Sequence, residues 1–223
     1  MQLFNEKKVI YILYQCGGMN LSYFLASLFI ASSIIMIVSS HWVYAAVINC
    51  VQIYPDACHG TNDNDVMKGS QQPNRILGED GNDKIFGLDG NDELRGGNGD
   101  DTLQGGDGAE GGILGEDGND KIYGGPAGDD ELIGGPGNDL VHGGDGNDVN
   151  LAGDVGSDVL FGDAGNDAIA HGVISGVTDP QRTLSDGSQD KIDCGPGNDV
   201  AWINVNTDHD TAKNCETVHT END

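Results

Sequence analysis

Residues 78–104 read GEDGNDKIF, GLDGNDELR and GGNGDDTLQ, three consecutive copies of one nine-residue pattern. The pattern is G-G-x-G-x-D-x-U-x, where U is an apolar residue, and it extends over residues 60–172 and again over 187–203. A fixed period of this kind indicates a repeat architecture, in which each unit packs only on its neighbours. The sequence therefore predicts a solenoid.

The residue types of the repeat predict a tight turn followed by a short strand. Glycine allows positive φ without a side-chain clash, so the first six residues can turn with their carbonyls directed inward. The last three residues form a strand whose single apolar side chain points inward. These inward residues are Ile85, Leu94, Leu103, Ile122, Leu132, Val141, Leu160 and Ile169. Each repeat makes half a circuit, so alternate turns stack on the same edge.

The aspartate at the sixth repeat position is the candidate metal ligand. Ca²⁺ accepts roughly six to eight oxygen ligands in irregular geometry, which stacked carbonyls and carboxylates can supply. One predicted edge carries Asp65, Asp83, Asp101, Asp120, Asp139 and Asp158. The other edge carries Asn74, Asp92, Glu110, Asp130, Asp148 and Asp167, and Asp199 belongs to the repeat at 187–203. Because Asn74 is neutral and Glu110 lies beside an extra residue, sites near these two are predicted to be weak or empty.

The repeat resembles the RTX, or haemolysin-type calcium-binding, repeats of secreted microbial proteins. GEDGNDKIF at 78–86 and GGPGNDLVH at 134–142 carry the resemblance. It implies an all-β fold, a parallel β-roll (β-solenoid) with several Ca²⁺ ions between its turns. It also implies that the chain folds when it is exported into calcium.

The charge of the chain supports a cation-dependent fold. The formal net charge is −27, and residues 78–171 hold 23 acidic residues and 3 basic ones. Without cations this stretch should be expanded, so binding free energy would be folding free energy. The charge also argues against nucleic acid as a partner, because polyanions repel each other.

The N-terminus predicts export. Residues 21–38 are free of charge, Lys7 and Lys8 precede them, and the small residues Ala45 and Ala46 follow. This order is typical of a helical signal peptide, here residues 1–46, with Met19 as an alternative start. The other interpretation is a membrane anchor through residues 21–45. We therefore expect a secreted, extracellular or cell-surface protein.

The ends of the repeat region read as caps. We expect an N-terminal cap at 47–59, repeats at 60–172, a loop at 173–186, and the last repeat with a C-terminal cap at 187–223. Trp202 is expected to be a core residue of the second cap, and a role in stacking on a ligand is the alternative.

Four cysteines remain in the expected mature chain, and they allow three pairings. Cys50–Cys58 and Cys194–Cys215 are favoured, because the other pairings would tie together the two ends of a long rod. Free thiols or a zinc site are the alternatives, although the spacings are unlike those of zinc motifs.

Catalysis is not expected. The chain has neither an H-E-x-x-H nor a G-x-S-x-G motif, its six histidines are scattered, and the repeats occupy nearly all of the mature chain. A calcium-binding module with a structural or cell-surface role is therefore predicted, with an extracellular polymer as one partner class. A secreted polyanionic calcium buffer and an accessory module of an extracellular hydrolase are the alternatives.

Overall fold

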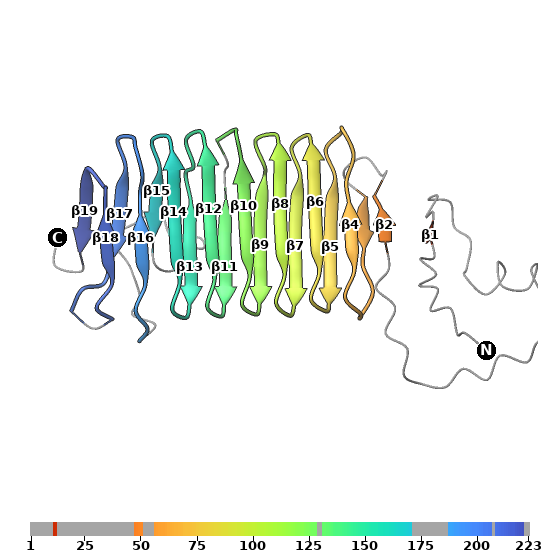
Figure 1. Cartoon of the computed structure of the whole chain (residues 1–223), viewed down its shortest axis with the longest axis horizontal. Coiled ribbons are helices and arrows are strands. Elements are labelled where there is room, and N and C mark those ends of the chain that lie inside the picture. The colour runs from red at the N-terminus through yellow and green to blue at the C-terminus, as the bar shows by residue number, and fades with distance from the viewer. Residues whose placement is uncertain are drawn as a thin grey trace, which may run out of the picture.

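The computed structural model describes residues 11–12, 47–50, 56–128, 131–170, 187–206 and 208–220. These residues form an elongated parallel β-solenoid in which successive strands alternate between two sheets (Figure 1). No helix occurs among them. The predicted all-β solenoid is confirmed.

The even-numbered strands, with β1, form one parallel sheet, here called sheet A. Its strands are β1 (Tyr11–Ile12), β2 (Val47–Asn49), β4 (Val66–Lys68), β6 (Lys84–Asp89), β8 (Thr102–Asp107), β10 (Lys121–Gly125), β12 (Leu140–Asp145), β14 (Val159–Ala164), β16 (Lys191–Asp193) and β18 (Thr211–Lys213).

The remaining odd-numbered strands form the second parallel sheet, sheet B. Its strands are β3 (Ala57–His59), β5 (Arg75–Asp80), β7 (Glu93–Asn98), β9 (Gly112–Asp117), β11 (Leu132–Pro136), β13 (Leu151–Val155), β15 (Ala168–Ala170), β17 (Val200–Ile203) and β19 (Thr217–Thr220).

Two repeats close one coil, as predicted. Lys84 of β6 pairs with Thr102 of β8, and Thr102 pairs with Lys121 of β10. The second of these coils is one residue longer than the first, yet the strands stay in register. The extra residue lies in the turn before β9, and longer turns also precede β11 and β13. Strand pairing therefore continues through the irregular repeats.

The core is two columns of apolar side chains, one from each sheet. All eight inward residues expected from the sequence are fully buried. The structure adds Met67, Ile76, Ile113, Leu151 and Ile192 to the columns. Leu151 pairs with Leu132 and Ile169, so it takes the inward place of the polar Asn150. One apolar residue per repeat becomes a continuous core only because the coils stack.

Glycine permits this close stacking of coils. Gly97 has a φ of 111°, and a Cβ on it would overlap the carbonyl oxygen of Glu79 in the preceding coil. Any side chain at this position would separate the two coils or strain the backbone.

The expected cysteine pairings are confirmed, and they lie at the two ends of the solenoid. The Cα atoms are 5.6 Å apart in Cys50–Cys58 and 5.1 Å apart in Cys194–Cys215. Trp202 corrects an expectation. Its neighbours Ala201 and Ile203 are buried in the interior, so Trp202 points outward and stacks on His219, with ring centroids 5.6 Å apart. The strand alternation places it on the outer face of sheet B, not in the core.

The expectations for the N-terminus lie largely outside the described residues. Of residues 1–46, only 11–12 are described, so neither the signal peptide nor the anchor at 21–45 can be compared with the structure. The expected loop at 173–186 is also outside. In the described part of the chain, no helix has the length and hydropathy needed to span a bilayer.

Candidate metal centre

The candidate ligands lie in two rows, one along each long edge of the solenoid. Most of these residues directly precede a strand, as Asp83 does before β6 and Asp92 does before β7, whereas Glu110 and Asp148 lie a little further from the starts of β9 and β13. The Asp83 row contains Asp65, Asp83, Asp101, Asp120, Asp139, Asp158, Asp190 and Asp210. The Asp92 row contains Asn74, Asp92, Glu110, Asp148, Asp167, Asp199 and Glu216. The turns that carry these rows appear at the ends of the strands in Figure 1.

Hydrogen bonds join the members of the Asp83 row from coil to coil. The backbone amide of Asp101 donates to Oδ1 of Asp120 over 2.7 Å, and Asp120 donates in the same way to Asp139. The pattern runs from Asp65 to Asp210. One carboxylate oxygen of each acceptor therefore fixes the stacking of adjacent turns.

The Asp92 row repeats this arrangement with interruptions. Asn74 donates to Asp92 over 2.7 Å, and Asp167 donates to Asp199 over 2.9 Å. At its C-terminal end Asp199 donates to Oε2 of Glu216 over 2.8 Å. Glu110 is fully buried beneath its turn, with its side chain over Gly105. The longer glutamate thus occupies the place that aspartate has elsewhere.

The second carboxylate oxygen differs sharply from the first. In seven aspartates Oδ2 is buried and has no hydrogen-bond partner among the described residues. The seven are Asp83, Asp92, Asp101, Asp120, Asp139, Asp167 and Asp199. Burying a carboxylate without a partner is costly, so a row of such oxygens fits a cation as the common partner.

The electrostatics lead to the same conclusion. Burial raises the pKa of Asp139 to about 8, against an ordinary value of 3.8, and that of Asp101 and Asp120 to about 7. The hydrogen bond that each accepts lowers the pKa, but desolvation outweighs it, and neighbouring carboxylates raise it further. The same cause raises the pKa of Asp83, Asp92 and Asp167 to about 6. In the described ranges no cationic side chain forms an ion pair with these six carboxyl groups.

Backbone carbonyl oxygens lie close to the Oδ2 atoms of the row aspartates. A Cβ built on Gly78 would lie 2.5 Å from Oδ2 of Asp83 and would overlap the carbonyl oxygen of Gly96 in the next coil. Gly115 has the equivalent neighbours, Asp120 and the Gly134 carbonyl. Glycine therefore leaves room beside a carboxylate oxygen from one coil and a carbonyl oxygen from the next.

The chemistry of this donor set fits a hard cation. All the donors are oxygens, and Ca²⁺ accepts mixed carboxylate and carbonyl ligands in flexible geometry. In the described ranges no three or more His, Cys, Asp or Glu side chains gather closely enough to hold a metal by themselves. Backbone carbonyls would therefore have to complete each coordination sphere.

The structure places most of the expected residues in these rows and adds others. Of the expected ligands only Asp130 lies outside the described residues. Sequence reasoning missed Asp190, Asp210 and Glu216. For Asp190 a signal was present, because Asp190-Lys191-Ile192 repeats the Asp-Lys-Ile of residues 83–85 and 120–122. Asp210 and Glu216 follow no glycine-rich turn, and their place is visible only from the strand register.

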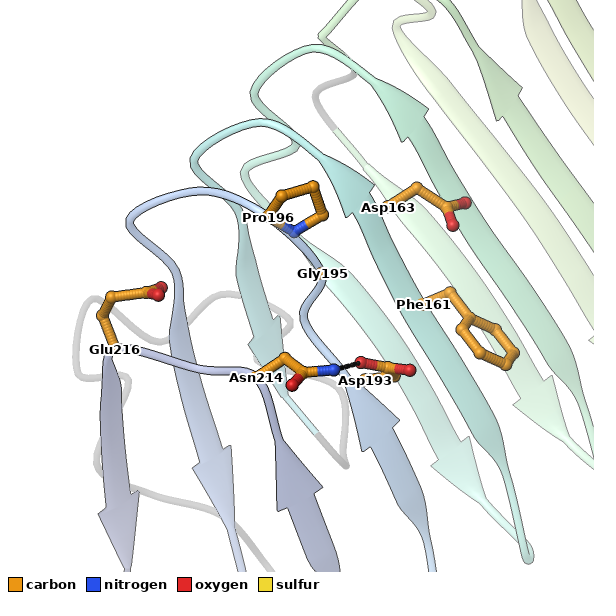
Figure 2. Close-up of a pocket in the computed structure, with 7 residues that line it drawn as sticks. All are labelled: Phe161, Asp163, Asp193, Gly195, Pro196, Asn214 and Glu216. Atoms are coloured by element: carbon orange, nitrogen blue, oxygen red, sulfur yellow. Dashed lines mark hydrogen bonds between the residues drawn. The ribbon is translucent and has the colours of Figure 1, made fainter.

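A surface pocket of about 500 Å³ lies at the C-terminal end of the Asp92 row (Figure 2). Glu216, Asp163 and Asp193 line it together with the ring of Phe161. Asn214 donates a hydrogen bond of 2.6 Å to Oδ1 of Asp193. Asp193 is thus held by a contact within the protein.

The repeats match a known family. A model of the RTX calcium-binding nonapeptide repeat (4 copies) matches residues 59–94, 86–110, 113–126, 127–149 and 150–173. Among curated proteins, none matches this sequence. The family match covers about half of the chain and includes the part of the two rows from Asp65 to Asp167. The chain therefore belongs to the RTX family of calcium-binding nonapeptide-repeat proteins.

Proposed function

We propose that this protein is a secreted module that folds when Ca²⁺ binds along its two turn rows, and that it has a structural or cell-surface role. The observation that carries the proposal is the set of seven buried Oδ2 atoms without a hydrogen-bond partner among the described residues. Calcium would supply the positive charge that these carboxylates lack. Metal binding would then drive folding, as in other small metal-dependent domains.

The proposed ligands are the row aspartates and the turn carbonyls that face them. The sequence-based set is Asp65, Asp83, Asp92, Asp101, Asp120, Asp130, Asp139, Asp148, Asp158, Asp167 and Asp199. Asp190, Asp210 and Glu216 extend the two rows. Asn74 and Glu110 interrupt the Asp92 row, so we propose weak or empty sites beside them. Mg²⁺ fits this donor set less well, because it demands a tight octahedron and retains its waters.

Export would explain why folding depends on calcium. We propose that residues 1–46 form the signal peptide, residues 47–59 the N-terminal cap, and residues 60–172 the repeats, followed by a loop at 173–186 and the C-terminal part at 187–223. Disulfides are typical of oxidising compartments, and both pairs here close local loops. Extracellular calcium modules have dissociation constants of roughly 10⁻⁴–10⁻³ M, so such a chain would stay unfolded before export.

A polyanionic calcium buffer is the second candidate. Its charge would suffice for loose cation binding, but a buffer needs neither a buried apolar column nor disulfides at both ends. The continuous core from Ile48 to Ile203 favours the folded module. The proposed role includes no catalytic step.

Calorimetric titration of the purified protein with Ca²⁺, and separately with Mg²⁺, tests the proposal. We expect several Ca²⁺ ions to bind per chain and Mg²⁺ to give little heat. The Asn74→Asp variant should bind more tightly or take up one further ion, because it supplies the carboxylate that the Asp92 row lacks at this position. Equal binding of both metals, with no difference in the variant, would support the buffer.

A further inference from the structure

All five lysines among the described residues lie on the outer face of sheet A. The sequence separates them widely, but the strand register aligns them. All are exposed. They are Lys68 on β4, Lys84 on β6, Lys121 on β10, Lys191 on β16 and Lys213 on β18. We call this surface the lysine face.

The register sets the spacing along this face. Lys84 pairs with Thr102, which pairs with Lys121, so the two lysines lie two strands apart, or about 10 Å. From Lys121 the same row continues through Leu140 and Val159 to Lys191. The positive charges therefore form a sparse stripe parallel to the solenoid axis.

Most of these lysines have no ion-pair partner in the part of the chain that the structure describes. Lys84, Lys121 and Lys191 form no ion pair with any described residue. Lys213 alone has such a contact, 2.7 Å from Oδ2 of Asp193. Lys68 lies over the ring of Phe86, 5.9 Å from its centroid.

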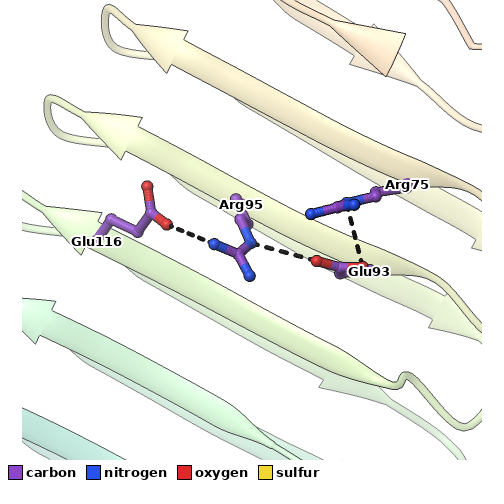
Figure 3. Close-up of polar contacts among 4 residues, drawn as sticks. All are labelled: Arg75, Glu93, Arg95 and Glu116. Carbon is purple, nitrogen blue, oxygen red and sulfur yellow. Dashed lines mark hydrogen bonds and ion pairs between the residues drawn. The ribbon is translucent and has the colours of Figure 1, made fainter. Parts of the chain in front are cut away.

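Sheet B provides a direct contrast. Its two arginines are held by acids in a chain of contacts (Figure 3). Arg75 lies 3.2 Å from Glu93, and Arg95 lies 3.3 Å from Glu93 and 3.4 Å from Glu116. The chain has a net charge of −27. Among the described surfaces, the lysine face is thus the one whose positively charged side chains remain available to a ligand.

A stack of rings runs between the lysines. His142 lies between Tyr123 and Phe161, with centroids 5.4 Å and 4.4 Å away and interplanar angles of 11° and 6°. Because the rings stack on one another from strand to strand, they turn their edges to solvent. The edge of an aromatic ring carries partial positive charge, and since Nδ1 of His142 already lies 2.9 Å from Oδ2 of Asp163, the edges of Tyr123 and Phe161 are those that favour an anionic ligand. Phe161 is the last ring of the stack, and Asp193 follows it on the next strand (Figure 2).

We propose that the lysine face binds a linear acidic polysaccharide laid along the solenoid axis. The face is straight, and its lysines are spaced for a polymer whose carboxylates are separated by uncharged sugar units. Thr102, Gln104 and Thr211 point outward between the charges and can hydrogen-bond to hydroxyl groups. The proposal names a partner for the surface role proposed above and rests on it.

More densely charged partners fit this face less well. Exposed acids at the ends of the strands, among them Asp89, Asp107 and Asp145, border the stripe. Duplex DNA carries one charge per about 1.7 Å of its axis, and such a polymer would meet these acids as well as the lysines. An anionic membrane needs an apolar surface that can insert, and the ring edges here are only part-exposed.

Hyaluronan, which has one carboxylate in each disaccharide, is the probe. Its binding to the calcium-loaded protein is measured by calorimetry for wild type and for Lys84→Gln/Lys121→Gln. The matched control is Arg75→Gln/Arg95→Gln, which changes the net charge equally on the other sheet. We expect binding that weakens with salt, a loss of about tenfold in the lysine variant, and little change in the arginine variant. Lys84→Arg/Lys121→Arg should bind like wild type.

Circular dichroism of each protein, recorded before polysaccharide is added, separates the two proposals. A chain that gains no β-structure with calcium would overturn the proposed function. A folded chain that does not bind hyaluronan, or that loses affinity equally in both glutamine variants, would overturn the lysine face. Tighter binding to duplex DNA or to phosphatidylserine vesicles than to hyaluronan would also overturn it.

Discussion

The backbone amide of Asp83 donates a hydrogen bond of 2.7 Å to Oδ1 of Asp101, which lies one coil further along the solenoid. Oδ2 of the same Asp101 side chain has no hydrogen-bond partner among the described residues. The two oxygens of one carboxylate therefore have different surroundings. The first holds the preceding coil in register, and under the proposed function the second would bind calcium.

The different surroundings of the two Asp101 carboxylate oxygens predict the effect of Asp101→Asn. Asparagine retains an oxygen that can accept the Asp83 amide hydrogen, but it removes the charge. We expect the Ca²⁺ concentration at the folding midpoint to rise about three- to tenfold, because calcium loses one anionic ligand. Without metal the variant should be no less stable than wild type, because an amide costs less to bury than a carboxylate. Circular dichroism with and without calcium measures both effects.

Asp89→Asn is the matched control for this variant. Asp89 is exposed at the end of β6, and its replacement removes the same charge. The Ca²⁺ concentration at the folding midpoint should change little in this variant. If both variants shift it equally, general electrostatics rather than a ligand at Asp101 explains the effect.

Stability without calcium should depend on pH in an unusual direction. Burial raises the pKa of Asp139 to about 8 and that of Asp101 to about 7, from an ordinary 3.8. Between pH 3.8 and about pH 8 the folded chain binds more protons than the unfolded chain, so its free energy of unfolding falls as pH rises. Metal-free protein should have most β-structure near pH 4 and lose it as pH rises through about 6 to 8.

Circular dichroism in calcium-free buffers across this range measures the trend. With calcium the dependence should reverse, because protons compete with the metal for the same carboxylates. A metal-free chain that gains β-structure as pH rises would show that the row aspartates are not buried as described.

Much of the fold could be predicted because the repeat is local. Each nine-residue unit contains its own turn, aspartate and inward residue, so the coil and the columns of apolar side chains follow from the period. Asp190 was missed because the break at 173–186 hides the register beyond it. Trp202 was misplaced because its apolar character suggested the core, whereas strand alternation decides its side. The lysine face could not be predicted, because it depends on coils of unequal length bringing distant residues into line.

Two valines, one inside the apolar columns and one outside them, should differ in how much their replacement by alanine lowers the free energy of unfolding. Val141 is fully buried in the column of sheet A, whereas Val149 is 57% exposed in a turn. Val141→Ala should lower the free energy of unfolding in calcium by about 2 kcal/mol, through lost burial and a small cavity. Val149→Ala, which makes the same chemical change, should be close to neutral. Urea unfolding of both variants in saturating calcium compares them, and equal effects would contradict the assigned core.

The central claim, that calcium folds the solenoid, is tested most directly by far-ultraviolet circular dichroism of the protein during a Ca²⁺ titration, with Mg²⁺ as the control. We predict a cooperative change from coil to β-structure with calcium alone, at about 10⁻⁴–10⁻³ M. A β-spectrum already complete in chelator, or a chain still unfolded at calcium concentrations well above this range, would contradict the account.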